Sequence, residues 1–113
     1  MKTTKISNDF HVTGQLELAN IPEITAAGFT TVICNRPDNE GWGQINHDVV
    51  KTAAEKAGLS FHYIPVGGGL THEMVHQMKT AITSSKGMVL GYCKSGMRAA
   101  NLYQAALQHK TLT

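Results

Sequence analysis

The feature that most constrains this chain is a regular alternation of short β-rich runs with amphipathic windows of helical spacing. Strands are expected at 10–12, 30–34, 59–66 and 88–92. Helices are expected after the capping residues Asn20, Asn46 and Thr71, and over residues 98–109. Parallel strands joined by helices of this length imply right-handed crossovers. The sequence therefore predicts an α/β fold with a mainly parallel central sheet flanked by helices, and leaves the strand order open.

Length and charge limit the classes of protein to which the chain can belong. Its 113 residues, without a Pro/Gly/Ser-rich linker, predict a single domain over residues 1–113. The net charge of +2, with no long basic run, argues against a nucleic-acid partner. No apolar stretch is long enough for a membrane span or a signal peptide, and two cysteines are too few for a disulfide framework. We expect a cytoplasmic domain with free thiols, no nucleic-acid partner and no membrane contact.

Chemistry-bearing residues gather where two of the expected strands end. Residues 34–38 read Cys-Asn-Arg-Pro-Asp, and residues 93–98 read Cys-Lys-Ser-Gly-Met-Arg. These two segments contain both cysteines and both arginines of the chain. Ligands of parallel α/β sheets bind beyond the carboxyl ends of the strands. The sequence therefore predicts that the two segments lie at one edge of the sheet and form the functional site.

The segment from Cys93 to Arg98 carries the stronger chemistry. A cysteine between a buried strand and a helix N-terminus is stabilised as thiolate by free N–H groups and by the helix dipole. Gly96 permits a tight turn whose N–H groups form an anion cradle, and Arg98 can bind an oxyanion through two parallel hydrogen bonds. Cys93 and Arg98 are the predicted catalytic residues, against the alternative of a buried structural cysteine in a non-catalytic binding module. The predicted substrate-binding residues are Lys94, Ser95, Gly96, Met97, Arg36 and Asp38.

Most of the chain resembles a known family. The resemblance rests on the segments 12–15, 28–33, 35–40, 63–66 and 92–98. In these segments the sequence is similar to the beta-lactamase-hydrolase-like, phosphatase-like domain family, also described as sulfur transferases. The resemblance implies a protein tyrosine phosphatase-like fold, with Cys93 as nucleophile and Arg98 as oxyanion ligand.

The loop length distinguishes the two chemistries linked to that family. Four residues separate Cys93 from Arg98; protein tyrosine phosphatases have one more, whereas rhodaneses have the same number, usually with Arg where this chain has Lys94. Such phosphatases also commonly carry His at the position of Tyr92, and an acidic residue where residues 67–69 here are glycines. We therefore predict a rhodanese-like sulfurtransferase that carries sulfane sulfur as a Cys93 persulfide. Its expected partners are a small anionic sulfur donor and a thiol acceptor, without a cofactor.

The alternative is a tyrosine or dual-specificity phosphatase that hydrolyses a phosphate ester through a Cys93 thiophosphate. Such an enzyme needs a general acid for a poor leaving group, and Asp38 or Glu40 could supply it. The competing interpretation of Asp38 is a turn residue or a salt-bridge partner of Arg36 or Arg98.

Three further residues or motifs have competing interpretations. Cys34 could resolve a disulfide or persulfide on Cys93, but a small buried hydrophobic role is favoured. Residues 72–76, His-Glu-Met-Val-His, match a zinc-protease signature. His72, Glu73 and His76 lie outside the apolar face of the predicted helix. This favours a solvent-exposed helix start instead of a zinc site, so no metal is expected. Trp42 is expected to anchor its loop.

Overall fold

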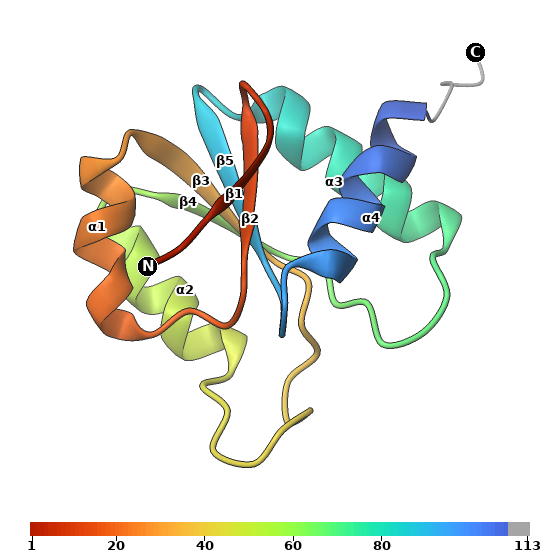
Figure 1. Cartoon of the computed structure of the whole chain (residues 1–113). Helices are drawn as coiled ribbons and strands as arrows, with labels where there is room; N and C mark the ends of the chain where they lie inside the picture. The colour runs from red at the N-terminus through yellow and green to blue at the C-terminus, as the bar shows by residue number, and fades with distance from the viewer. Residues whose placement is uncertain (109–113) are drawn as a thin grey trace.

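The computed structural model describes residues 1–108 and contains a five-stranded sheet of order β1-β2-β5-β3-β4 (Figure 1). The strands are β1 (Thr4–Ser7), β2 (Phe10–Thr13), β3 (Phe29–Cys34), β4 (Ser60–Tyr63) and β5 (Met88–Tyr92). The helices are η1 (Leu18–Asn20), α1 (Ile21–Ala26), α2 (His47–Lys56), α3 (His72–Ser84) and α4 (Met97–Gln108). β1 runs antiparallel to β2, and every other neighbouring pair is parallel. The predicted α/β class, with a mainly parallel sheet flanked by helices, is confirmed.

Helices cover both faces of the sheet, α1 and α2 on one side and α3 and α4 on the other (Figure 1). Along the central strands, Val32 and Leu90 belong to the core beneath α1 and α2, whereas Ile33 and Val89 belong to the core beneath α3 and α4. All four side chains are at most 1% exposed. This two-sided burial explains why β3 and β5 are largely apolar, without a polar alternation.

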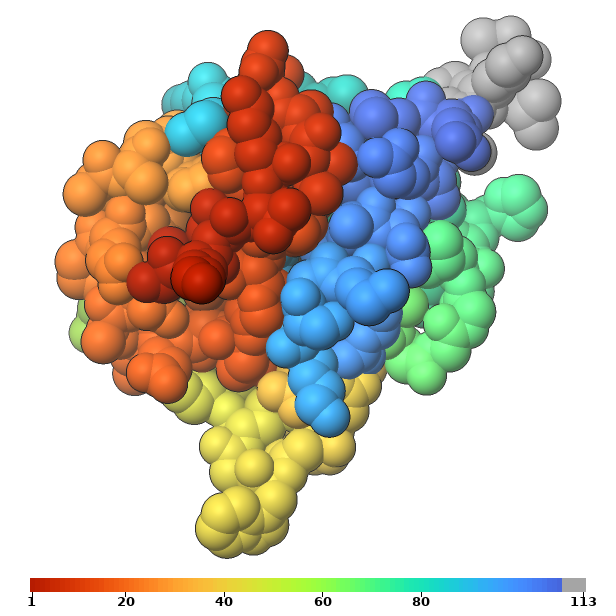
Figure 2. Space-filling view, viewed as in Figure 1, coloured from red at the N-terminus to blue at the C-terminus, as the bar shows by residue number. Residues whose placement is uncertain are grey.

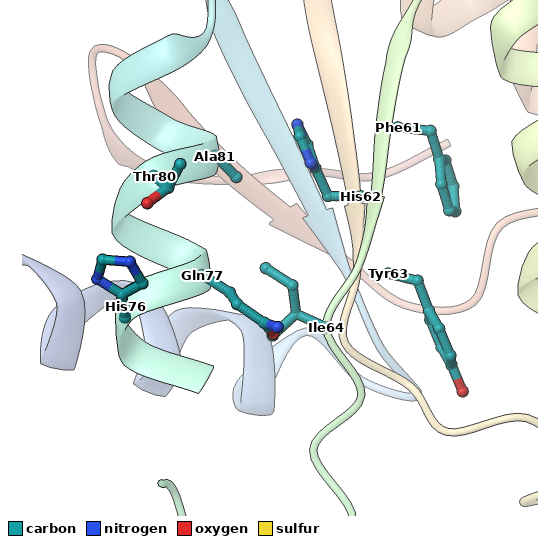
Figure 3. Close-up of a pocket in the computed structure, with 8 residues that line it drawn as sticks. All are labelled: Phe61, His62, Tyr63, Ile64, His76, Gln77, Thr80 and Ala81. Atoms are coloured by element: carbon teal, nitrogen blue, oxygen red, sulfur yellow. The ribbon is translucent and has the colours of Figure 1, made fainter. Parts of the chain in front are cut away.

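Strand β4 lies at one edge of the sheet and is shorter than the predicted 59–66. Figure 3 shows the alternation of its side chains: His62 and Ile64 point toward α3, whereas Phe61 and Tyr63 point to the opposite side. After Tyr63, the N–H of Ile64 still donates to the carbonyl at the end of β3 at 2.9 Å. The pairing with β3 continues past Pro65, because the N–H of Val66 donates to the carbonyl oxygen of Asn35 at 3.0 Å.

The helix starts follow the predicted positions, although only one cap uses its side chain as expected. Thr71 Oγ1 accepts the N–H of Met74 at 3.1 Å at the start of α3. Asn20 and Asn46 occupy N-cap positions without a capping hydrogen bond. Helix α4 begins at Met97, one residue before the prediction, and the predicted end at residue 109 lies outside the described residues. Strand β1, which was not predicted, has no buried residue.

The absence of a side chain at Gly91 lets α4 pack closely on β5. A Cβ there would lie 2.8 Å from Phe10 Cζ and 3.2 Å from the Cβ of Ala99 in α4. The first approach is closer than side-chain carbons come, and the second is tight enough that Ala99 would have to shift. The close packing brings the first turn of α4 directly beneath the end of β5.

The carboxyl ends of the parallel strands meet at one edge of the sheet, at the bottom of Figure 1. Strand β5 lies between β2 and β3, so the turn that follows it is central at this edge. The β3–α2 connection, residues 35–46, projects beside this turn and stands clear of the body in Figure 2. The two chemistry-bearing segments predicted to meet therefore lie side by side.

No helix within residues 1–108 is both long and apolar enough to cross a membrane.

Candidate active site

Cys93 lies inside the turn between β5 and α4. Its side chain is 0% exposed, and the N–H of Gly96 points back at it, with 3.0 Å between the nitrogen and Sγ. Gly96 has φ +95°, a region that L side chains rarely adopt. The turn thus directs a backbone donor at the sulfur, as a cradle for a negative charge requires.

The end of β2 supports this turn from beneath. The N–H of Cys93 faces the carbonyl oxygen of Thr13 at 3.4 Å. A Cβ at Gly14 would lie 3.0 Å from the carbonyl oxygen of Lys94, so only glycine allows this approach without a shift. The backbone of residues 13–14 therefore sets the shape of the loop that holds the sulfur.

The other loop residues predicted to bind substrate point mainly to solvent. Lys94 and Ser95 are exposed, and Met97 is 68% exposed. Ser95 Oγ accepts the N–H of Met97 at 3.4 Å, a long bond at the start of α4. The substrate contacts of these three side chains stay predictions.

Arg98 reaches across the sheet edge to the other loop. Its Nη1 donates to Glu40 Oε2 at 2.6 Å and to the carbonyl oxygen of Val66 at 2.9 Å, and its Nη2 donates to Glu40 Oε1 at 2.6 Å. The paired carboxylate raises the pKa of Arg98, and the Cys93 thiol adds to that effect. Arg98 is therefore a fixed cation beside the sulfur.

Glu40 joins both arginines of the chain. Besides the fork to Arg98, Oε1 accepts from Arg36 Nε at 3.0 Å. The hydrogen bonds from Arg98, followed by those from Arg36, lower the pKa of Glu40 to about 2. Glu40 is therefore ionised at neutral pH and holds no proton for a leaving group.

Arg36 is buried rather than open to a substrate. Its exposed fraction is 7%, and Nη1 donates to Gln15 Oε1 at 3.0 Å while Nε serves Glu40. The contacts that Arg36 makes in this structure are to Gln15 and Glu40. Its contact with a substrate stays a prediction. Gln15 was not predicted as a residue of the site. The signal that could have identified it is its position just after the end of β2.

Asp38 pairs with a histidine, not with either arginine. Its Oδ2 lies 2.7 Å from His47 Nδ1, and its Oδ1 accepts the N–H of His47 at 2.8 Å, at the first turn of α2. The His47 ring stacks on Tyr63 with centroids 3.6 Å apart, and the N–H of Asp38 donates to the Tyr63 hydroxyl at 3.0 Å. Asp38 lies in a turn, as one of the two interpretations had it; the salt bridge to Arg36 or Arg98, the other, is not formed, because Glu40 binds both arginines.

Cys34 faces the opposite side of the sheet from Cys93. It packs in the core beneath α1 and α2 beside Tyr92, whereas Cys93 belongs to the core beneath α3 and α4. Burial raises the pKa of the Cys34 thiol, although the neighbouring Tyr92 hydroxyl lowers it in part. A protonated thiol in a separate core supports the interpretation of Cys34 as a buried hydrophobic residue.

The zinc-protease motif lies on the solvated start of α3. His72, Glu73 and His76 are exposed, and Glu73 accepts from Gln77 at 3.1 Å. Within residues 1–108, no three His, Cys, Asp or Glu residues are placed to share a metal.

The expectation that Trp42 anchors its loop is wrong, because the ring is fully exposed. The loop is closed instead by Gln44. Its Oε1 accepts the N–H groups of Glu40 and Gly41, each at 3.0 Å, and its Nε2 donates to the carbonyl of Pro37 at 2.9 Å. These bonds span the loop without help from the indole.

A cavity of about 420 Å³ lies between α3 and β4 (Figure 3). Its lining residues are Phe61, His62, Tyr63, Ile64, His76, Gln77, Thr80 and Ala81. None of these belongs to the 93–98 segment; the residue shared with the site described above is Tyr63, which contacts Asp38 and His47.

Known proteins share this fold and much of this sequence. A proposed phosphatase of Neisseria meningitidis superimposes with a TM-score of 0.82 and 30% identity, over 95% of this chain and 79% of the other. Tk-PTP in its active form shares the fold, with a TM-score of 0.64 and 18% identity over 93% of this chain and 80% of the other. The fold is thus protein tyrosine phosphatase-like. These neighbours favour the phosphatase alternative over the sulfurtransferase prediction.

Sequence relatives agree with the resemblance noted above. The Beta-lactamase hydrolase-like protein of Agrobacterium fabrum is 35% identical over 104 residues, which cover 91% of this chain and 24% of that protein. The chain therefore spans about a quarter of the length of this relative. Residues 3–109 match the family described as Beta-lactamase hydrolase-like protein, phosphatase-like domain. The chain belongs to this family of beta-lactamase hydrolase-like, phosphatase-like domains.

Proposed function

We propose that this domain is a sulfurtransferase in which Cys93 carries sulfane sulfur as a persulfide, with Arg98 and the turn N–H groups as the anion cradle. The observation that carries the proposal is that the carboxylates near Cys93 are already ionised or engaged in hydrogen bonds. Glu40, the carboxylate in contact with Arg98, is ionised and held by two arginines. Asp38 is engaged by His47, and residues 67–69 are glycines. A cradle without an available acid suits a leaving group that needs no proton.

The proposed reaction uses a donor whose leaving group is a stable anion. The Cys93 thiolate attacks the outer sulfur of thiosulfate, so that a new S–S bond forms while the bond to the sulfite sulfur breaks. The bonding electron pair departs with sulfite. An acceptor thiolate then attacks the outer sulfur of the persulfide, becomes a persulfide itself and releases the Cys93 thiolate. Neither step requires a general acid, and Arg98 neutralises the charge of the donor.

The second candidate, a phosphatase, is favoured by the structural neighbours reported above. Here the Cys93 thiolate attacks phosphorus, an S–P bond forms and the ester P–O bond breaks; water then hydrolyses the thiophosphate to inorganic phosphate. The departing alkoxide must be protonated, and a missing acid typically costs about 10²–10⁴ in rate for a poor leaving group. The two candidates therefore differ in how the rate depends on the leaving group.

The decisive experiment measures the intact mass of the reduced protein after brief exposure to thiosulfate or glutathione persulfide. We expect wild type to gain one sulfur atom and to lose it to cyanide, while Cys93→Ser gains none. Turnover of phenyl phosphate and p-nitrophenyl phosphate is measured in parallel, because only phenol is a poor leaving group. Rapid hydrolysis of both esters without sulfur uptake would overturn the sulfurtransferase proposal and establish the phosphatase.

A further inference from the structure

Trp42, in the loop between β3 and α2, is the most exposed large apolar side chain within residues 1–108. Its ring belongs to neither of the two hydrophobic cores of the fold. Folded proteins bury most of the surface of their tryptophans, because an aromatic ring of this size gains much free energy when it leaves water. A fully exposed indole is therefore a candidate for burial against a partner.

The backbone on both sides of Trp42 is held in place without the indole. A Cβ at Gly41 would lie 2.6 Å from Arg36 Nη2, so the loop passes directly over a guanidinium that is itself buried. Gly43 has φ +72°, a conformation that side chains rarely allow and that turns the chain back. The N–H of Gly41 donates to Gln44 Oε1 at 3.0 Å. The loop thus presents the indole on a fixed turn, as the anchor residues of interfaces are presented.

This loop is continuous with the site around Cys93. Arg36 and Arg98 both donate to Glu40, at 3.0 Å and 2.6 Å. Met97, beside Arg98 at the start of α4, is 68% exposed. Figure 2 shows the loop projecting from the body of the molecule next to the start of α4. Two exposed apolar side chains, the indole and Met97, are therefore carried by the two segments that surround a fully buried sulfur.

The surroundings of the indole indicate what kind of partner covers it. Small molecules bind in concave sites that enclose most of their surface, and a fully exposed ring has no wall around it. A protein partner supplies the missing walls itself, and Trp and Met are enriched at protein interfaces. Residues 37–47 contain no Lys or Arg that would bind anionic lipid headgroups. These features favour a protein over a small molecule or a membrane.

We infer that, given the proposed sulfurtransferase function, Trp42 binds the sulfur acceptor, and that this acceptor is a protein whose cysteine lies on an extended segment between apolar residues. The apolar neighbours of that cysteine cover the indole and Met97, while the cysteine itself enters the cradle. Its thiolate attacks the outer sulfur of the Cys93 persulfide, the S–S bond breaks, and Cys93 leaves as a thiolate. Trp42 thus selects the acceptor and takes no part in sulfur uptake from thiosulfate.

The test compares two short acetylated peptides that have a central cysteine and differ only in the flanking residues, which are leucine in one and serine in the other. Transfer of sulfur from the loaded protein to each peptide is measured as kcat/KM by mass spectrometry. The variants are Trp42→Ala, Trp42→Phe and Leu107→Ala. Leu107 provides the matched control, because it is 59% exposed at the opposite end of α4 from the cradle.

Wild type should transfer sulfur to the leucine-flanked peptide about tenfold faster than to the serine-flanked peptide. Trp42→Ala should remove this preference, Trp42→Phe should retain most of it, and Leu107→Ala should leave it unchanged. Discharge of the persulfide to cyanide should be the same in all of these proteins, because cyanide is too small to contact the indole from within the cradle.

A second measurement does not depend on sulfur chemistry. Trp42 is the single tryptophan of the chain, so its fluorescence reports directly on burial of the indole. The probes are the same two peptides with serine in place of the cysteine. The leucine-flanked probe should shift the emission of wild type to shorter wavelength, and the serine-flanked probe should not.

Equal kcat/KM values for the two peptides in wild type, or an unchanged preference in Trp42→Ala, would overturn the inference. An emission shift caused by a higher protein concentration alone, or by phosphatidylcholine vesicles, would assign the indole to a second copy or to a membrane and would also overturn it. An emission shift with the leucine-flanked probe, but no sulfur uptake by wild type, would refute the proposed reaction and leave the binding role of Trp42 supported.

Discussion

Replacing Gly96 by alanine tests whether the backbone shape of the turn makes Cys93 reactive. An alanine at φ +95° costs about 1–2 kcal/mol in backbone strain. Its Cβ would lie 3.4 Å from the Thr13 carbonyl oxygen and from Val12 Cγ2, which adds little. A domain of this size is stable by about 5–15 kcal/mol, so the variant should remain folded.

The functional effect should exceed the effect on stability. Relief of the strain rotates the peptide that carries the Gly96 N–H, and so moves the donor that lies 3.0 Å from Cys93 Sγ. A hydrogen bond to a charged group is worth about 1.5–3 kcal/mol. We therefore expect the rate of persulfide formation from thiosulfate to fall about tenfold or more.

Gly58→Ala is the matched control, because Gly58 has φ +87° at the end of α2 and nothing lies within 4 Å of the position that an added Cβ would take. Urea unfolding should show a loss of about 1–2 kcal/mol for both variants, while only Gly96→Ala loses sulfur uptake. Full uptake in Gly96→Ala, despite the same loss of stability, would refute the argument that the cradle depends on this turn. An unchanged stability of Gly58→Ala would refute the strain argument itself.

Three other predictions follow from the contacts of the site. Asp38→Ala removes the acceptor of the His47 N–H, so the free energy of unfolding should fall by about 1 kcal/mol. Sulfur uptake by this variant, measured by intact mass, should not change. A loss of sulfur uptake would show that Asp38 takes part in the reaction. The pKa of Glu40 is lowered to about 2 in the folded state, so its contribution to stability is complete above its ordinary value of 4.5 and is lost as the pH falls toward 2. Urea midpoints between about pH 5 and pH 2.5 should therefore fall less steeply in Glu40→Gln than in wild type, and parallel curves would contradict the ion pair. Cys34→Ala should still take up one sulfur on Cys93, and failure to do so would restore Cys34 as a resolving thiol.

Local patterns were sufficient to locate most secondary structure. β5 spans the predicted residues 88–92, and Thr71 caps α3 through its side chain. Both follow from short-range rules: a short continuous apolar run suits a strand that is buried on both faces, and a threonine oxygen satisfies a free helix N–H. Strand β1 escaped prediction because a short, exposed edge strand is stabilised by its partner β2, not by its own pattern.

The two loops of the site could be assigned to one edge of the sheet without the structure, because the carboxyl ends of parallel strands coincide. Which side chains meet there could not be assigned. Glu40 and Arg98 are separated by 58 positions, and Asp38, two residues from Glu40, is an equally reasonable partner from sequence. The exposed Trp42 illustrates the same limit, since Gln44 closes the loop by hydrogen bonds that composition does not reveal.

The amino-acid sequence by itself determines the α/β class and the position of the turn from Cys93 to Arg98, because periodicity, capping and loop length are local properties. Three other features exist only in the folded chain: the strand order, the separation of Cys34 from Cys93 across the sheet, and the engagement of Arg98 by Glu40. These features depend on packing and on ion pairs between segments far apart in the chain. Several pairings of strands or side chains have similar local free energies, and only the complete fold selects one of them.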